Sequence, residues 1–198
     1  MKKITTVIYL SLFLLLHCGF AFAAAPAWEF DKAHSRFGFT VKHIFSTVHG
    51  YFEDYSGTFL FDPDNLTESK IIFEVQAKSV QTTINKRDNH LRSADFFDVK
   101  KYPVITFAST GIKNVGGNQY EVTGKLTMKD VSKDVILPMT FHGIKGHPME
   151  SSKLVAGFDI KLPIDRLEYK VGDGRFYEMG VVDKTVNIDV SLEMLRNK

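Results

Sequence analysis

Apolar and polar side chains alternate with a period of two along most of this chain. The clearest case spans residues 35–43, where Phe37, Phe39 and Val41 share one face and Arg36 lies on the other. Such alternation is typical of a β-strand with one buried face. Together with comparable segments that end at turn residues, it predicts eight strands: 35–43, 50–61, 69–78, 104–112, 120–128, 135–141, 154–162 and 186–192.

The predicted strands are joined mostly by short turns, with neither a strand–helix–strand rhythm nor an internal repeat. A single antiparallel sheet of eight strands has two exposed edges, and closure into a barrel removes both. We therefore predict an all-β fold, an eight-stranded antiparallel barrel with one short charged helix after the third strand. Such a barrel is filled by its own side chains or holds one small ligand. A two-sheet sandwich is the alternative, because alternation alone does not separate the two.

The predicted helix spans residues 87–98 and carries the densest charge in the chain. Because an isolated helix of about a dozen residues is marginal in water, it must dock on the strands around it. Asp88 and Arg92 are i,i+4 neighbours, and in the plainer interpretation they form an exposed ion pair that contributes less than about 1 kcal/mol. In the sharper interpretation the helix is a lid, whose arginines meet the polar end of a lipid-like ligand.

The chain begins with a basic Met-Lys-Lys and an apolar run over residues 4–16, followed by the small-x-small pattern of Ala21 and Ala23. This pattern predicts a secretory signal peptide over residues 1–23, cleaved after Ala23 or Ala25. A transmembrane anchor is the alternative, but the run is shorter than the roughly 20 residues that a span needs. Export to the periplasm, or secretion beyond it, is therefore expected.

Cleavage leaves residues 24–198 as one domain. It removes two lysines and no acidic residue, so 25 − 2 = 23 basic residues face 23 acidic ones and the formal net charge falls from +2 to 0. No concentrated basic surface indicates nucleic acid. The only cysteine, Cys18, lies in the signal, where it also suggests a lipoprotein signal, although His17 before it fits that poorly. Seventeen Phe and seven Tyr exceed what a small core requires, which indicates an apolar interior with surplus aromatic surface.

Motifs for catalysis are absent from the sequence: there is no nucleophile elbow, phosphate-binding loop, dinucleotide fingerprint or zinc-binding helix motif. Six histidines follow the signal, and no pair has a strong metal-ligand spacing, so no metal is expected. His34, His43 and His90 either cluster at one end of the barrel or lie scattered on the surface. Their spacing alone favours the scattered arrangement.

Several motifs resemble the bacterial YceI-like family. They span roughly Trp28 to Leu195 and include Asp31-x-x-His34-Ser35, Phe37-x-Phe39-x-Val41-x-His43, Arg87-Asp88-x-His90-Leu91-Arg92-Ser93-x-Asp95-Phe96-Phe97-Asp98 and Tyr102-Pro103-x-Ile105-x-Phe107-x-Ser109. The resemblance implies an extended lipocalin-like barrel with a long apolar interior. It also implies binding of polyisoprenoid compounds, such as polyprenyl diphosphates or ubiquinone-like quinones, and in some members fatty amides.

Two segments depart from the family pattern. Met128, Lys129 and Asp130 stand where the family often has a small residue followed by Gly, and we expect this to alter only a turn. Residues 167–182 carry extra glycines and an Arg-Phe-Tyr cluster that do not align, and this segment could border the opening.

The expected function is an exported carrier or storage protein, not an enzyme, that needs no cofactor and binds a long-chain isoprenoid lipid or quinone as its ligand. Ten buried carbons would supply about 8 kcal/mol before the costs of binding. The apolar tunnel is predicted to be lined by Phe37, Phe39, Val41, Phe52, Phe59, Phe73, Val75, Ile105 and Phe107. The polar end is predicted to consist of His34, His43, Arg87, Asp88 and His90.

Two other functions remain open from the sequence. An enzyme would use His90 and Asp88 as an acid–base pair on an isoprenoid. A stress-related protein-interaction module would have a packed barrel and an apolar docking patch. Transient contact with a membrane fits the carrier, and the oligomeric state, a homodimer included, is open.

Overall fold

The computed structural model describes residues 24–198, and the predicted signal peptide over residues 1–23 lies outside them. In the described part of the chain, no helix is both long and apolar enough to cross a membrane.

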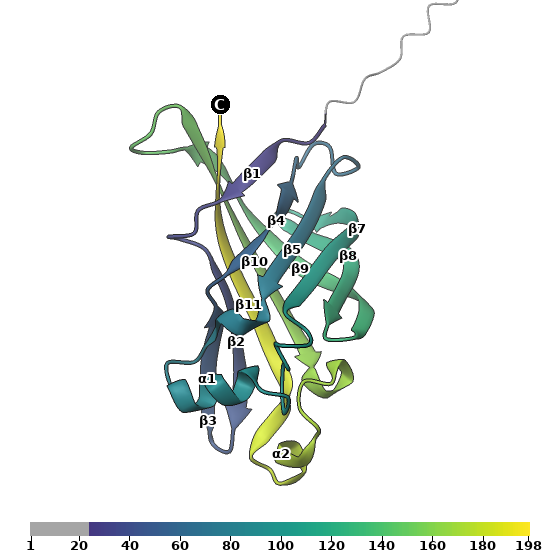
Figure 1. Cartoon of the computed structure of the whole chain (residues 1–198). Coiled ribbons are helices and arrows are strands. Elements are labelled where there is room, and N and C mark those ends of the chain that lie inside the picture. Colours follow the sequence, from purple (N-terminus) through teal and green to yellow (C-terminus); the bar gives the residue numbers. More distant parts are fainter. Residues whose placement is uncertain (1–23) are drawn as a thin grey trace, which may run out of the picture.

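Eight antiparallel strands close into a barrel, which confirms the predicted fold class (Figure 1). Around the ring they follow the order β1 (Ala27–Phe30), β4 (Tyr55–Leu60), β5 (Lys70–Gln76), β7 (Val104–Gly116), β8 (Gln119–Met128), β9 (Val131–Gly146), β10 (Lys153–Asp165) and β11 (Val182–Asn197). The short strand β1 closes the ring, because it pairs with β4 on one side and with β11 on the other.

Three further strands extend the sheet beside the first half of β11. They are β2 (Arg36–His43), β3 (Ser46–Phe52) and β6 (Val80–Gln81), which pair in the order β11, β2, β3, β6. The chain passes from β1 to β2 beside Glu193, where the Ser35 hydroxyl donates to the Glu193 carbonyl at 2.9 Å and accepts from the Glu193 amide at 3.0 Å. The same edge of β11 therefore pairs with β2 along its first part and with β1 near its C-terminal end.

The helical segments gather at one end of the molecule. These are η1 (Ala77–Ser79), α1 (Asn85–Arg92), η2 (Arg166–Tyr169) and α2 (Arg175–Glu178). Figure 1 shows α1 and α2 in the half of the molecule that carries the turn between β2 and β3, while the C-terminus and the hairpin between β9 and β10 lie at the other extreme. We call the first the helical end and the second the β1 end.

The structure corrects three predicted elements. The segment 50–61 forms two strands, with a break at residues 53–54, and the break expected at 44–49 is only the two-residue turn Ile44–Phe45, with Ile44 in the left-handed region (φ 52°). The helix ends at Arg92 rather than at residue 98, because Ser93 leaves the helical conformation and donates its hydroxyl to the His90 carbonyl. Turns follow as far as residue 101.

Aromatic rings fill the half of the barrel beside β1. Phe59, Phe61 and Phe158 are almost fully buried, with centroids 4.7 Å apart for Phe59 and Phe158 and 5.2 Å apart for Phe61 and Phe158. Phe141 stacks on Phe158 at 5.1 Å. Edge and offset contacts of this kind are the preferred packing of aromatic rings, so this half of the barrel is filled by its own side chains.

Candidate functional site

A cavity of about 170 Å³ lies in the helical half of the barrel. Within the described residues, Thr106 and Arg166 contribute the only polar side chains to its lining. The apolar lining residues are Phe37, Phe39, Val41, Phe52, Phe73, Val75, Leu91, Phe96, Phe97, Ile105, Phe107, Leu126, Met128, Leu137, Ile160, Ile164, Val171, Val182, Val186, Ile188 and Val190, with Gly38 beside them. Such a surface suits a hydrocarbon and offers almost nothing to a polar ligand.

Strand register explains how β2 and β11 build one wall. In the ladder, Phe37 faces Val190, Phe39 faces Ile188 and Val41 faces Val186. Each pair is an aromatic or β-branched contact on one face of the sheet, so the alternation in both strands turns all six side chains inward.

Two of the lining rings lie over glycines of a neighbouring strand. A Cβ atom at Gly50 would lie 2.2 Å from Cζ of Phe39, and one at Gly124 would lie 2.5 Å from Cζ of Phe107. The rings therefore occupy the space that a side chain at either position would need. This arrangement lets broad rings form the wall while part of the interior stays open.

The structure places eight of the nine residues predicted for the tunnel in the lining of this cavity. The exception is Phe59, which packs in the aromatic cluster beside β1 instead. Alternation correctly predicted that Phe59 faces the interior of the barrel. The rings of Phe61 and Phe158, however, fill the space in front of it. Lipid binding by the other eight stays a prediction.

Arg87 and Asp88, predicted at the polar end, both bind Thr82. Arg87 donates from Nε to the Thr82 hydroxyl and from Nη2 to the Thr82 carbonyl, each at 2.7 Å. Asp88 is buried and accepts from the amide and hydroxyl of Thr82. The expected Asp88–Arg92 pair does not form in the described structure, because Arg92 donates to the carbonyls of Lys78 and Val80. These contacts anchor α1 to the segment before it.

His90 belongs to a contact between α1 and α2. Its Nε2 lies 2.9 Å from Oδ2 of Asp95, and Nη2 of Arg175 lies 2.9 Å from the same oxygen. The hydrogen bond from His90, followed by the charge of Arg175, holds the pKa of Asp95 below its usual range against the opposing effect of burial. Phe176 stacks on Phe96 at 6.0 Å. We call these residues the α1–α2 clasp: His90, Asp95, Phe96, Arg175 and Phe176.

His34 and His43 lie at opposite ends of β2, so the three histidines are scattered, as their spacing favours, and do not gather at one polar end. His34 precedes the strand, whereas His43 ends it and faces Ser46 and Val182 in the ladders. Neither lines the cavity. Asp88 and His90 also have separate partners, so the acid–base pair expected for an enzyme is not assembled from them.

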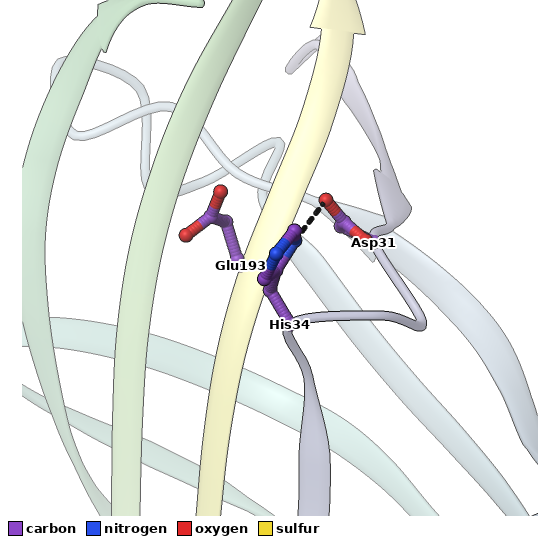
Figure 2. Close-up of side chains that lie close together, drawn as sticks. All are labelled: Asp31, His34 and Glu193. Carbon is purple, nitrogen blue, oxygen red and sulfur yellow. Dashed lines mark hydrogen bonds and ion pairs between the residues drawn. The ribbon is translucent and has the colours of Figure 1, made fainter.

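His34 forms a small polar cluster with Asp31 and Glu193, shown in Figure 2. Its Nδ1 lies 2.8 Å from Oδ2 of Asp31, and this contact raises the pKa of His34 and lowers that of Asp31. One ligand atom from each of the three side chains lies within 4.8 Å of the others, so a divalent cation could bind here. The His34 side chain is 65% exposed. The cluster therefore belongs to the surface and not to the cavity.

Arg166 is the charged lining residue that the sequence analysis missed. It is 4% exposed and donates from Nε to the Asp183 carbonyl at 2.9 Å, from Nη1 to the Val171 carbonyl at 2.7 Å and from Nη2 to the Val182 carbonyl at 3.3 Å. Burial lowers its pKa, against the nearby acidic residues that raise it. The available signal was the adjacent unaligned segment 167–182, for which a place at the border of the opening was considered.

Lys129 connects three segments around the cavity. Its ammonium group donates to the carbonyls of Phe96 at 2.9 Å and Lys170 at 2.8 Å. The departure at residues 128–130 therefore does more than alter a turn, since it ties the chain after α1 to the chain after η2.

Comparisons with known proteins agree with this fold. The sequence pattern of the YceI-like domain matches residues 28–194. A UPF0312 protein of Pseudomonas putida strain GB-1 is 32% identical over 185 residues, which cover 93% of each chain. The crystal structure of BcnA from Burkholderia cenocepacia has a TM-score of 0.73 at 27% identity and covers 85% of this chain and 100% of that one.

A more distant structure shares the fold alone. It is a polyisoprenoid binding domain from Saccharophagus degradans implicated in plant cell wall breakdown, with a TM-score of 0.61 at 15% identity. The match covers 87% of this chain and 98% of that domain.

Proposed function

Because this chain belongs to the YceI-like family, we propose that it is an exported carrier or storage protein, without catalytic activity, that holds an isoprenoid lipid in its cavity. The ligand would be a polyprenyl diphosphate or a ubiquinone-like quinone, and no further cofactor is required. The observation that carries the proposal is the cavity, whose wall is apolar except for Thr106 and Arg166. Polyisoprenoid binding by the Saccharophagus degradans domain, which has the same fold, supports it.

The size of the cavity limits what enters without movement. An engineered apolar cavity of about 150 Å³ is enough for benzene, so about 170 Å³ holds only the first part of an isoprenoid chain. The lining residues Val41, Val182 and Val186 are only half-buried, and we therefore place the opening of the cavity at the helical end. A longer chain would extend through this opening or displace the segment after α1. Each buried methylene adds about 0.8 kcal/mol.

Transient contact with a membrane belongs to the same proposal, because an isoprenoid has to be taken from a bilayer or returned to one. Ile44, Phe45, Tyr177 and Met179 expose large apolar side chains at the helical end. The amide of Ile44 donates to the Val181 carbonyl at 3.0 Å, so the β2–β3 turn lies against the chain that enters the cavity wall at Val182.

The test is native mass spectrometry of the protein purified from an exporting bacterial host, followed by solvent extraction. We expect a discrete added mass that extracts as one isoprenoid lipid. Sequencing of the exported N-terminus should begin within residues 24–26, after the predicted cleavage. A clean apo mass, together with no uptake of added polyprenyl lipid or quinone, would contradict the carrier and favour the protein-interaction module.

A pair of matched substitutions tests the cavity itself. Val190 lines the cavity and is 5% exposed, whereas Val122 is fully buried but lies outside the lining. We expect Val190→Phe to fill the space, reduce lipid uptake at least severalfold and leave the melting temperature unchanged or higher. Val122→Phe should instead destabilise the fold by about 1–3 kcal/mol, because it overpacks a closed core. Equal destabilisation by both would mean that the interior at Val190 is also packed shut.

A further inference from the structure

The side chains of Asp31, His34 and Glu193 come together where the edge of β11 passes from one partner strand to the next. β1 pairs with residues 194–195 of β11, while β2 begins opposite Ser191. Glu193 lies between these two ladders, and the connection from β1 to β2, which carries Asp31 and His34, passes beside it. Figure 2 shows the three side chains gathered at this junction.

Hydrogen bonds fix the backbone that carries these side chains. The Asp31 amide donates to the Glu193 carbonyl at 2.9 Å, and the His34 amide donates to the Asp31 carbonyl at 3.1 Å. The Ser35 hydroxyl binds both the carbonyl and the amide of Glu193, and the Tyr55 hydroxyl donates to the Ser35 carbonyl at 3.1 Å. The three side chains therefore start from fixed positions, and a preorganised site loses less entropy when it binds a ligand.

The two carboxylates at the junction have no lysine or arginine in contact within the described chain. Asp31 forms its one ion pair among residues 24–198 with His34, and the carboxylate of Glu193 has neither an ion pair nor a hydrogen bond there. Lys153 acts on Asp31 only from a distance, because its ammonium group pairs with Glu150 at 2.7 Å. Two negative charges thus face one imidazole, and a divalent cation would balance them.

The donor atoms fit a first-row divalent cation, Zn²⁺ above all. An imidazole nitrogen together with carboxylate oxygens is a common ligand set for Zn²⁺, whereas Mg²⁺ and Ca²⁺ prefer oxygen alone. Zinc–ligand distances of about 2.1 Å place tetrahedral donors about 3.4 Å apart. The separations here are 2.8 Å between His34 Nδ1 and Asp31 Oδ2 and at most 4.8 Å for the others, so small side-chain rotations suffice. Because His34 is mostly exposed, an ion can enter from solvent and keep a water as its fourth ligand.

An ion at this junction would strengthen the closure of the barrel. β1 closes the ring through two residue pairs with β4 and two with β11. The junction joins segments that lie 158 residues apart in the sequence, and a chain with a single cysteine forms no internal disulfide that would do the same. An ion that binds only the folded state stabilises that state.

We propose that Asp31, His34 and Glu193 bind one Zn²⁺ ion, which links the connection between β1 and β2 to β11. The site is separate from the proposed lipid binding, because none of the three side chains lines the cavity. Removal of Zn²⁺ should therefore loosen the closure of the barrel and leave the apolar wall as it is.

Isothermal titration of the untagged exported protein, after treatment with EDTA, measures the binding of Zn²⁺ itself. Wild-type protein should show one saturable site. His34→Gln and Glu193→Gln should each weaken binding at least about tenfold, since even indirect partners of a metal site are worth that much. His142→Gln removes an imidazole that contacts a single carboxylate, Asp159 at 2.9 Å, and belongs to no group of three ligands in the described chain. It should leave the affinity within about twofold of wild type.

Hydrogen exchange measures the effect on the barrel closure. The amides of Asp31 and Glu193 both donate across the junction, to the Glu193 carbonyl and the Ser35 hydroxyl. Saturating Zn²⁺ should slow their exchange severalfold in wild-type protein and leave it unchanged in Glu193→Gln. Zinc binding without slower exchange of either amide would contradict the link between the strands.

The assignment is overturned if wild-type protein binds no Zn²⁺ at concentrations up to about 1 mM, or if Glu193→Gln binds it as tightly as wild type. An equal loss in His142→Gln and His34→Gln would indicate unspecific binding by surface histidines. Displacement of Zn²⁺ by an equal concentration of Mg²⁺ would contradict the choice of metal.

A structural measurement covers the case in which a variant does not fold. In crystals of wild-type protein grown with Zn²⁺, an anomalous-scattering peak should lie within about 2.3 Å of one ligand atom each from Asp31, His34 and Glu193. A zinc peak at other side chains, with none at this junction, would refute the site.

Discussion

Asp88, predicted to lie at the polar end of the ligand site, also holds a helix in place. Its carboxylate is 1% exposed and accepts from both the amide and the hydroxyl of Thr82, while its second oxygen has no partner among the described residues. A buried carboxylate with two fixed donors is a strong local anchor. Thr82 also accepts hydrogen bonds from Arg87, so the contacts of Thr82 hold the start of α1 in place.

The first prediction concerns this anchor. Asp88→Ala should lower the free energy of unfolding by about 1–3 kcal/mol, because it leaves two buried donors on Thr82 unsatisfied. Asp88→Asn keeps an acceptor oxygen and should cost less. Urea denaturation measures both, and Asn89→Ala, an exposed neighbour on α1, should change stability by less than about 0.5 kcal/mol. Lipid retention that falls in Asp88→Asn while stability is unchanged would support the predicted place of Asp88 in the binding site.

Single residues also show which features of the structure the sequence could not predict. The period of two turned Phe37, Phe39 and Val41 toward the cavity, because side-chain direction in a strand is a local property. Arg166 carried no such signal, since its burial depends on carbonyls of residues 171, 182 and 183 that only the fold brings together. The same reason explains Asp88, whose partner is Thr82 and not its helical neighbour Arg92.

The strands were easier to predict from the sequence than the residues at which they end or the side chains that fill the barrel. The eight-stranded barrel follows from alternation and short turns, yet β1, which closes it, is only four residues long and too short to show a period. The 50–61 segment is continuous in apolar pattern but divides into β3 and β4, which pair with different neighbours. Alternation also cannot show which half of the barrel is packed and which is hollow. Whether a half is packed depends on rings, such as Phe158, that come from strands distant in the sequence.

The clasp between α1 and α2 holds one side of the cavity. Phe96 and Leu91 line the cavity, and Phe96 stacks on Phe176 of α2. Asp95 joins the two helices, because it binds both His90 and Arg175, and Arg175 also faces Asp173. We therefore expect a ligand chain longer than the cavity to require movement of this clasp.

The second prediction is the pH dependence of this clasp. The folded state lowers the pKa of Asp95, so its contribution is present above the ordinary aspartate pKa of about 3.9 and is lost as the pH falls through the lowered value. Asp95→Asn should thus accelerate backbone hydrogen exchange over residues 94–99 at pH 5 and have a smaller effect at pH 3. Asp159→Asn, at the separate His142–Asp159 contact, should leave this segment unchanged at both pH values. An equal effect of Asp95→Asn at pH 5 and pH 3 would show that its charge does not hold the clasp.

At the scale of the whole molecule, one barrel is divided into a packed half and a hollow half. Rings from β4, β9 and β10 fill the half beside β1. In the helical half, β2 takes the place of β1 along β11, β3 pairs with the other edge of β2, and the segment after α1 completes the wall. Because the packed half is filled by its own side chains, we expect the hollow half to open without unfolding the barrel.

The third prediction concerns how the open end meets a membrane. Phe45 is 96% exposed at the helical end, whereas Met149 is 87% exposed in the hairpin between β9 and β10 at the β1 end. If the helical end docks on the bilayer, Phe45→Ser should weaken binding to phosphatidylcholine–phosphatidylglycerol vesicles and slow lipid exchange by about tenfold, since it removes one large apolar group from the contact. Met149→Ser removes a comparable exposed side chain from the other end and should change neither. Vesicle flotation and transfer of a fluorescent isoprenoid measure the two effects. Equal losses in both variants would indicate unspecific adsorption, and no loss in Phe45→Ser would place the membrane contact on another surface.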